Sequence, residues 1–210
     1  MQELRGRLEE GIRHLELALP EGTVDALLVY LAMLIKWNKA FNLTAVRTPG
    51  EMVTRHLLDS LAVVPHLHGQ RIIDVGSGAG LPGIPLALAF PQREFVLLDS
   101  NSKKTRFLTQ VRAELDLANL SVVHGRVEDY HPSPGFDCVI SRAYASIADI
   151  LSSSGHLLVE HGEFLAMKGG LPEQELAALP SRWRVQELLP LQVPGLEQEQ
   201  RHLLRIVAAA

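Results

Sequence analysis

Apolar residues recur every three or four positions in the first third of the chain. This spacing runs from Leu4 to Leu19 and stops at Pro20, which predicts an amphipathic helix. Residues 24–37 predict a second, strongly apolar helix, and Thr48-Pro49 can start a third over residues 51–64, ended by Pro65. We therefore expect residues 1–66 to form a helical extension packed on the remainder of the chain.

From residue 71 onward, short apolar strands alternate with helices. Strands are predicted at 71–75, 94–98, 120–124, 136–141, 163–168, 184–190 and 202–207, with helices at 83–89, 102–117, 147–152 and 173–179. Strands separated by helices are typical of a parallel sheet covered on both faces. This alternation predicts an α/β domain over residues 67–210.

The overall composition excludes several classes of protein. With 210 residues, 47% of them apolar, the chain can bury a substantial core, and its formal charge of -4 confines any nucleic-acid binding to a local basic patch. Its single cysteine, Cys138, excludes an internal disulfide and a cysteine-based zinc site. No apolar run is long enough to span a membrane, and the first ten residues do not form a signal core. We expect a cytoplasmic protein without a bound metal.

The most informative segment joins the first strand of this α/β region to its helix. Asp74 ends an apolar run and is followed by Gly76, Gly78, Gly80 and Gly83. Glycines at such a turn let the backbone bend sharply and approach a nucleotide-like cofactor. Two patterns overlap here, because the last three glycines match the dinucleotide sequence G-x-G-x-x-G. The first three match the acid-x-G-x-G-x-G sequence of S-adenosylmethionine (SAM) methyltransferases.

The position of the strand favours the methyltransferase pattern. The strand ends immediately before Gly76, so the tight turn is expected there rather than two residues later. In that frame Asp74 can reach the cationic methionyl amine of SAM, directly or through water, whereas the dinucleotide frame leaves Asp74 without a role. An oxidoreductase that uses a nicotinamide cofactor remains the alternative.

Other candidate binding residues follow the next strands, because ligands bind beyond the carboxyl ends of parallel strands. Asp99 ends the second strand and is expected to hydrogen-bond the ribose hydroxyls; it is otherwise an acid near a helix N-terminus. Val127 and Glu128 follow the third strand, where SAM enzymes contact adenine. Arg142 ends the fourth strand and can grip a carboxylate, a phosphate or a base.

The same fourth-strand loop restricts the methyl acceptor. It lacks the Asp/Asn-Pro-Pro-aromatic motif that binds exocyclic amines, and Cys138, predicted to be buried, cannot activate a pyrimidine carbon. Methylation of guanine N7 needs neither that motif nor a nucleophilic cysteine, because N7 is unprotonated at neutral pH and its lone pair attacks directly. Positioning alone can then supply much of the acceleration, and we assign no catalytic acid or base. Arg142 is the candidate positioning group.

Across most of its length the sequence resembles the bacterial 16S rRNA guanine-N7 methyltransferases, the RsmG or GidB family. The resemblance is carried by these segments: Trp37-Asn38, 41–45, 55–61, 74–83, Ser141-Arg142-Ala143, Lys168-Gly169 and Arg201-His202-Leu203. It implies a class I SAM-methyltransferase fold, Rossmann-like, with a seven-stranded sheet whose last strand is antiparallel. The implied reaction is methylation of N7 of guanine 527, in the 530 loop of 16S rRNA.

The resemblance also implies site residues and partners. It places cofactor contacts at Gly76, Leu81, Val127, Glu128 and Arg142, while Asp99 stands where many relatives have Glu. Arg205 is a local departure, because an apolar residue is expected in that strand. The implied partner is 16S rRNA, in the small ribosomal subunit or an assembly intermediate, and a monomer is expected.

The sequence allows two roles for several polar residues. His56, Asp59 and Lys168 either act at the site or fix the structure, and the sequence does not decide between these. Basic residues that can contact RNA phosphates are Lys36, Lys39, Arg47, Arg55, Arg71, Lys103, Lys104 and Arg106. Alternatives to the rRNA enzyme are a SAM methyltransferase acting on a small molecule or protein and a non-catalytic RNA-binding protein.

Overall fold

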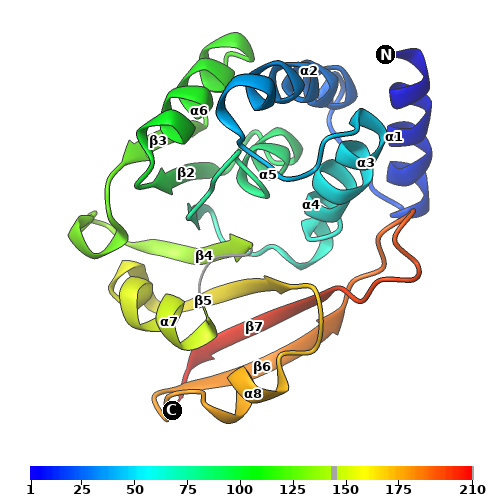
Figure 1. The fold of residues 1–210 in the computed structure, drawn as a ribbon. Helices are drawn as coiled ribbons and strands as arrows, with labels where there is room; N and C mark the ends of the chain where they lie inside the picture. Colours follow the sequence, from blue (N-terminus) through cyan, green and yellow to red (C-terminus); the bar gives the residue numbers. More distant parts are fainter. Residues whose placement is uncertain (143–145, 210) are drawn as a thin grey trace.

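The computed structural model describes residues 1–142 and 146–209, in which seven strands form one sheet between layers of helices (Figure 1). Ala143 of the predicted Ser-Arg-Ala segment lies outside the described residues. The strands are β1 (Arg71–Val75), β2 (Glu94–Asp99), β3 (Leu120–His124), β4 (Phe136–Arg142), β5 (Leu158–Lys168), β6 (Trp183–Pro190) and β7 (His202–Ala208). They coincide with the predicted strands to within one residue, except that β5 begins five residues earlier than expected.

The strand order in the sheet is β3-β2-β1-β4-β5-β7-β6. β1 to β5 are parallel, whereas β7 is antiparallel to both β5 and β6. The seven-stranded sheet with an antiparallel last strand is therefore confirmed. The chain proceeds from β1 to β2 and β3 on one side and returns to β4 on the other. The carboxyl ends of β1 and β4 thus flank the point where the strand order reverses, which is where such sheets bind ligands.

The α-helices lie on both faces of the sheet, with α1 to α6 on one side and α7 on the other (Figure 1). They are α1 (Gln2–His14), α2 (Thr23–Phe41), α3 (Pro49–Met52), α4 (Asp59–Leu61), α5 (Gly83–Ala89), α6 (Ser102–Glu114), α7 (Ile147–Ser154) and α8 (Glu173–Ala177). Short 3₁₀ turns lie at Val64–His66, Val127–Asp129 and Gly155–Leu157. Among the described residues, no helix is both long and apolar enough to cross a membrane.

The two faces of the sheet bury separate apolar clusters. Ile72 and Ile140 face a cluster that includes Leu31 and Leu57 of the N-terminal helices, whereas Ile73 faces the cluster under α7. Side chains alternate along a strand, so a strand that is apolar at every position must be covered on both faces. The N-terminal helices therefore share a core with the sheet, and the division at residues 66 and 67 stays a prediction.

The third helix differs from its prediction. α3 continues into a π-helical segment, Val53–Leu58, and then into α4, which ends at Leu61. Pro65 was expected to end this helix but lies in the separate 3₁₀ turn that follows. A π segment adds one residue per turn, which apolar spacing does not reveal, and such segments are frequent at functional sites.

Two arginines of the sheet form ion pairs within the fold. Arg71 is the first residue of β1, and Arg205 lies in the middle of β7, opposite Leu165. Arg71 pairs with Glu94 (Nε to Oε2, 2.8 Å) and donates to the Gly135 carbonyl, so it does not join the predicted phosphate-facing surface. Arg205, the departure noted in the sequence, is buried and paired with Glu163 and Glu187. Because both carboxylates compensate its charge, an arginine is tolerated in this strand.

We expect Gly83→Ala to destabilise the protein by about 1–3 kcal/mol. A Cβ at Gly83 would overlap the Leu97 side chain and lie 2.8 Å from the Asp74 carboxylate, both of which are buried. The matched control is Gly6→Ala in α1, where an added Cβ meets nothing within 4 Å. That change should stabilise the protein by about 0.5–1 kcal/mol. Chemical denaturation measures both, and equal effects would contradict the packing argument.

Candidate functional site

The glycine-rich turn lies at the switch point, between β1 and α5. Gly76, Gly78 and Gly80 have φ angles of 68°, 59° and 89°. At Gly78 an added Cβ would meet no heavy atom closer than 3.8 Å, so the backbone is open to a ligand on that side. At Gly80 a Cβ would overlap Ile84, so packing excludes a side chain there. The tight turn begins at Gly76, as the methyltransferase pattern predicts.

Asp74 lies behind this turn and is fully buried. Its Oδ2 accepts a hydrogen bond from the Gly83 N–H at 2.9 Å, at the start of α5. Its Oδ1 has no hydrogen-bond partner among the described residues. Burial raises the pKa of the Asp74 carboxyl to about 7, against the opposing effects of the Gly83 N–H and the Arg142 charge. Asp74 therefore orders the turn and keeps one acceptor atom available.

Asp99 joins the end of β2 to the turn. Its Oδ2 accepts from the Gly78 N–H at 2.9 Å, and its Oδ1 accepts from the Asn101 N–H at 2.8 Å. Lys104 Nζ lies 3.6 Å from the same carboxylate. Asp99 thus holds both the glycine turn and the start of α6. The second contact is the helix N-terminal role considered from the sequence, whereas ribose binding stays a prediction.

A cavity of about 240 Å³ lies between these residues and the loop after β3. Asp99, Lys104 and Gly76 line one side, and Val127 and Glu128 line the other. Val127 is buried, whereas Glu128 is exposed and lies 3.3 Å from Arg126. The Glu128 backbone N–H and the Arg126 charge hold the pKa of the Glu128 carboxyl below its usual range. The structure therefore brings together the residues predicted to hold ribose and adenine.

A second cavity, of about 470 Å³, shares Gly76 and Lys104 with the first. The turn lines it from Gly76 to Ala79 and again at Leu81. Basic side chains from distant segments also line it: Arg55, Lys104, Arg142, Lys168 and Arg201. The acidic lining residue is Asp59. The cavity thus combines the predicted cofactor turn with a strongly basic wall.

Asp59 is buried in this wall and binds two arginines. Its Oδ2 accepts from Arg142 Nη1 at 2.9 Å, and its Oδ1 accepts from Arg201 Nε at 3.1 Å. Glu199 similarly joins Arg201 (3.0 Å) to Arg55 (2.5 Å). The two carboxylates connect the N-terminal helices, the end of β4 and the loop before β7.

His56 lines the same cavity and is buried. Its Nε2 lies 2.9 Å from Thr44 Oγ1, and its Nδ1 has no hydrogen-bond partner among the described residues. Burial, followed by the charge of Arg142, lowers the pKa of the His56 imidazole to about 4. At neutral pH the imidazole is therefore uncharged, which suits a positioning role.

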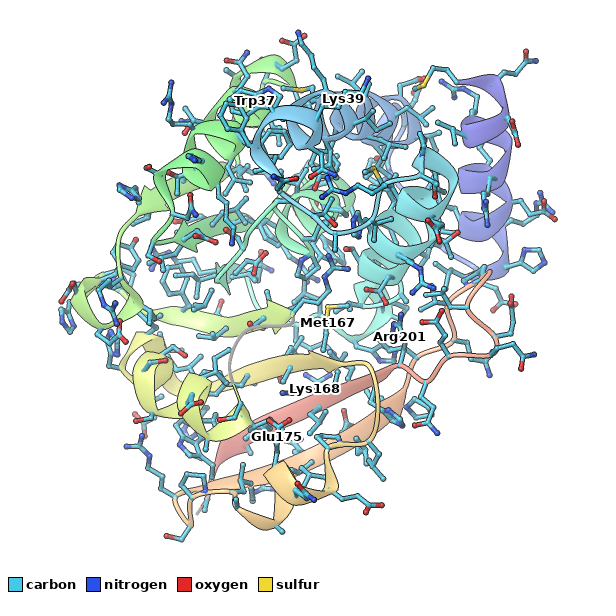
Figure 2. The ribbon with its side chains drawn as sticks, viewed as in Figure 1. Trp37, Lys39, Met167, Lys168, Glu175 and Arg201 are labelled. Atoms are coloured by element: carbon cyan, nitrogen blue, oxygen red, sulfur yellow. The ribbon has the colours of Figure 1, made fainter. Side chains whose placement is uncertain are left out.

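Lys168, at the end of β5, pairs with Glu175 of α8, and both are marked in Figure 2 near Met167 and Arg201. Its Nζ lies 3.0 and 2.9 Å from the two Glu175 carboxylate oxygens. Burial would raise the pKa of Glu175, but hydrogen bonds from Lys168 and from the Ile147 N–H lower it overall. Lys168 is thus both a lining residue of the cavity and a structural link to α8.

Sequence reasoning missed two residues of this region and part of the position of a third. Lys104 was predicted to contact RNA phosphates, and it also lines both cavities beside Asp99. Glu199 was not singled out, because its partner Arg55 lies 144 positions away and no local pattern joins them. Tyr30 was passed over as an apolar helix residue, although its buried hydroxyl contacts the glycine turn. A tyrosine in a fully buried helix face is a usable signal, since its hydroxyl needs a partner.

The pKa of His56 predicts a pH-dependent stability. The folded state binds fewer protons at His56 than the unfolded state between about pH 4 and 6.5, so this contribution is lost as the pH falls through that window. When the pH falls from 7 to 4, wild type should therefore lose roughly 3 kcal/mol more free energy of unfolding than His56→Gln, at 1.36 kcal/mol per pKa unit. Chemical denaturation across this range measures the difference.

The control is His161→Gln, because the His161 side chain is 91% exposed. This variant should keep the pH dependence of the wild type. The raised pKa of Asp74 increases the free energy of unfolding as the pH falls, which is opposite to the effect of His56. This contribution is the same in wild type and in both variants, so it cancels in the comparison. Parallel stability curves for wild type and His56→Gln would show that His56 is not buried in its neutral form.

Comparison with known sequences identifies a family. The profile of a family described as rRNA small subunit methyltransferase G matches residues 23–204. The ribosomal RNA small subunit methyltransferase G of Pseudomonas paraeruginosa is 57% identical over 198 residues, covering 94% of this chain and 92% of that protein. The protein of the same name from Shewanella amazonensis is 57% identical over 183 residues, covering 87% of this chain and 88% of its own.

Solved structures support the fold. A SAM-dependent methyltransferase from Thiobacillus denitrificans, in complex with S-adenosylhomocysteine, has a TM-score of 0.53 at 14% identity, covering 72% of this chain and 90% of that one. The mitomycin 7-O-methyltransferase MmcR has a TM-score of 0.65 at 17% identity, covering 85% and 60%. These likenesses show a Rossmann-like class I methyltransferase fold. On its sequence relatives, the chain belongs to the rRNA small subunit methyltransferase G family.

Proposed function

We propose that this chain transfers a methyl group from SAM to N7 of guanine 527 in the 530 loop of 16S rRNA. The observation that carries the proposal is the cavity of about 470 Å³, in which the glycine turn meets basic residues from five other segments. An RNA nucleotide offers a phosphate and a base to such a wall, both of which arginine and lysine bind well. Family membership makes SAM the methyl donor and favours it over the nicotinamide alternative.

The residues around the turn fit SAM. We propose that Asp99 binds the ribose and that Val127 and Glu128 hold the adenine in the smaller cavity. Gly78 presents open backbone, and the Oδ1 of Asp74 is a buried acceptor without a partner among the described residues. The cationic methionyl amine of SAM suits that acceptor. Bound SAM supplies an electrophilic methyl group on a positively charged sulfur.

The remaining proposed cofactor contacts line the larger cavity. Gly76 lines both, and Leu81 and Arg142 line the larger one. Arg142 is fixed by Asp59 and by the Arg55 carbonyl, to which its Nη1 donates at 2.8 Å. A guanidinium held in this way can orient a substrate without moving, so we assign it a positioning role.

The acceptor chemistry needs no general base. Guanine N7 is a hydrogen-bond acceptor that carries no proton, so its lone pair is free to attack. His56 is uncharged at neutral pH and bound to Thr44, which suits a wall of the acceptor cavity rather than a proton carrier. We propose that the chain accelerates transfer by holding N7 in line with the methyl group.

Exposed basic residues on the N-terminal half of the fold are the proposed route for RNA. They are Lys36, Lys39, Arg47, Lys103 and Arg106, on α2, on the loop that follows it, and on α6. Leu43, Thr44 and Val46 of that loop line the cavity, so an RNA strand crossing the loop would reach it. We propose that the substrate is the small ribosomal subunit or an assembly intermediate, in the cytoplasm. A monomeric state stays a prediction.

The direct test supplies tritiated SAM and small ribosomal subunits from a strain that lacks the modification. We expect label at N7 of guanine 527, located by mass mapping, and less label on protein-free 16S rRNA if a particle is the substrate. Subunits that already carry the methyl group are the control and should accept none. Label at another nucleotide, or none while SAM still binds, would overturn the proposed acceptor.

The cofactor assignment predicts that Asp99→Asn weakens SAM binding about 10- to 100-fold, because a charged acceptor is lost. Isothermal titration measures the dissociation constant. The matched control is Asp129→Asn, which changes the exposed acid that directly follows Glu128 and should bind SAM normally. Normal affinity in folded Asp99→Asn would place the ribose elsewhere.

A further inference from the structure

Tyr30 links the N-terminal extension to the glycine turn. It lies in α2 and is fully buried, and its hydroxyl donates a hydrogen bond to the Ala79 carbonyl at 2.7 Å. Ala79 lies between Gly78 and Gly80, in the part of the turn that lines the larger cavity. Among the described residues, this is the hydrogen bond that reaches the turn from residues 1–66.

The other hydrogen bonds of the turn come from the sheet and from within the turn. Gly76 N–H donates to the Leu98 carbonyl at 2.9 Å, and Gly78 N–H donates to Asp99, so both partners belong to β2. Within the turn, Gly80 N–H donates to the Ser77 carbonyl at 2.7 Å. Among the described residues, neither the sheet nor the turn donates to the Ala79 carbonyl of the same peptide. Tyr30 supplies the partner from the opposite side.

The Tyr30 ring is itself held in place. Its centroid lies 6.2 Å from that of Phe107 in α6, and Trp37 of α2 lies 5.5 Å from the same Phe107 ring. Aromatic rings at these distances pack favourably and restrict one another. The hydroxyl is therefore presented to Ala79 by a rigid cluster that joins α2 to α6.

We propose that Tyr30 is a positioning residue of the cofactor site, which fixes the Ala79–Gly80 peptide and thereby the backbone that faces SAM. The helical extension then contributes to cofactor affinity as well as to acceptor binding. This inference rests on the proposed binding of SAM at the turn. It differs from a purely structural role, in which the hydroxyl would stabilise the fold without affecting affinity.

The test is Tyr30→Phe, which removes the hydroxyl and keeps the ring. We expect the SAM dissociation constant and the KM for SAM to rise about three- to tenfold, the effect of one hydrogen bond. At saturating SAM, kcat with small ribosomal subunits should stay within about twofold, since the reacting groups are untouched. Isothermal titration and initial rates measure these quantities, and chemical denaturation measures stability.

The matched control is Thr23→Val. Thr23 is also buried in α2, and its hydroxyl donates to a backbone carbonyl of α5, that of Leu88, at 3.4 Å. Leu88 lies outside the turn, so Thr23→Val should lower stability without changing SAM affinity. An equal loss of SAM affinity in both variants would mean that general loosening of α2, and not the Tyr30 contact, is responsible.

Unchanged SAM affinity in folded Tyr30→Phe would overturn the inference. Asp99→Asn separates this failure from that of the proposed site: weak binding there with normal binding in Tyr30→Phe rejects only the role of Tyr30. Normal binding in both rejects SAM binding at the turn. If Tyr30→Phe is partly unfolded, the same comparison is made at a lower temperature, at which chemical denaturation shows that the variant is folded.

Discussion

The carboxylate of Asp59 connects the helical extension to the edge of the sheet where the site forms. It is buried, and each of its two oxygens accepts a hydrogen bond from an arginine, Arg142 or Arg201. Those arginines come from the end of β4 and from the loop before β7. One buried charge therefore requires that three segments far apart in sequence meet at one place. Removing either arginine would leave Asp59 partly unpaired and separate the wall of the larger cavity from the sheet.

This pairing limits how the cavity attracts RNA. Five basic residues line it against Asp59 alone, yet Asp99, Glu175 and Glu199 each hold one or more of those basic residues in place. Counting these acids, the local excess is about one positive charge. The cavity is therefore suited to orienting a nucleotide that has arrived, because its side chains are fixed in advance. Long-range attraction must come from the exposed lysines and arginines of α2 and α6, whose charges are not neutralised in this way.

The sequence predicted the sheet and the position of the glycine turn well, because both depend on local patterns. Runs such as Ile72 to Val75 end in the turn that they predict, and strand ends place Asp99 and Arg142 at one edge. The π-helical segment was not predictable, since its extra residue per turn leaves no periodic trace. Pairs such as Arg55 and Glu199 were also missed, because only the completed fold brings them together.

Buried polar residues in otherwise apolar helices are what make the extension part of the site. Tyr30 holds the glycine turn, and Asn38 binds both the Thr44 N–H (2.9 Å) and the Val46 carbonyl (3.2 Å) of a loop that lines the larger cavity. Asp59 completes the series. A buried polar side chain that lacks a hydrogen-bond partner lowers the stability of the fold, so each of these three residues requires its partner. Because each partner lies in the cavity lining or next to it, the packing of these helices on the sheet also shapes the larger cavity.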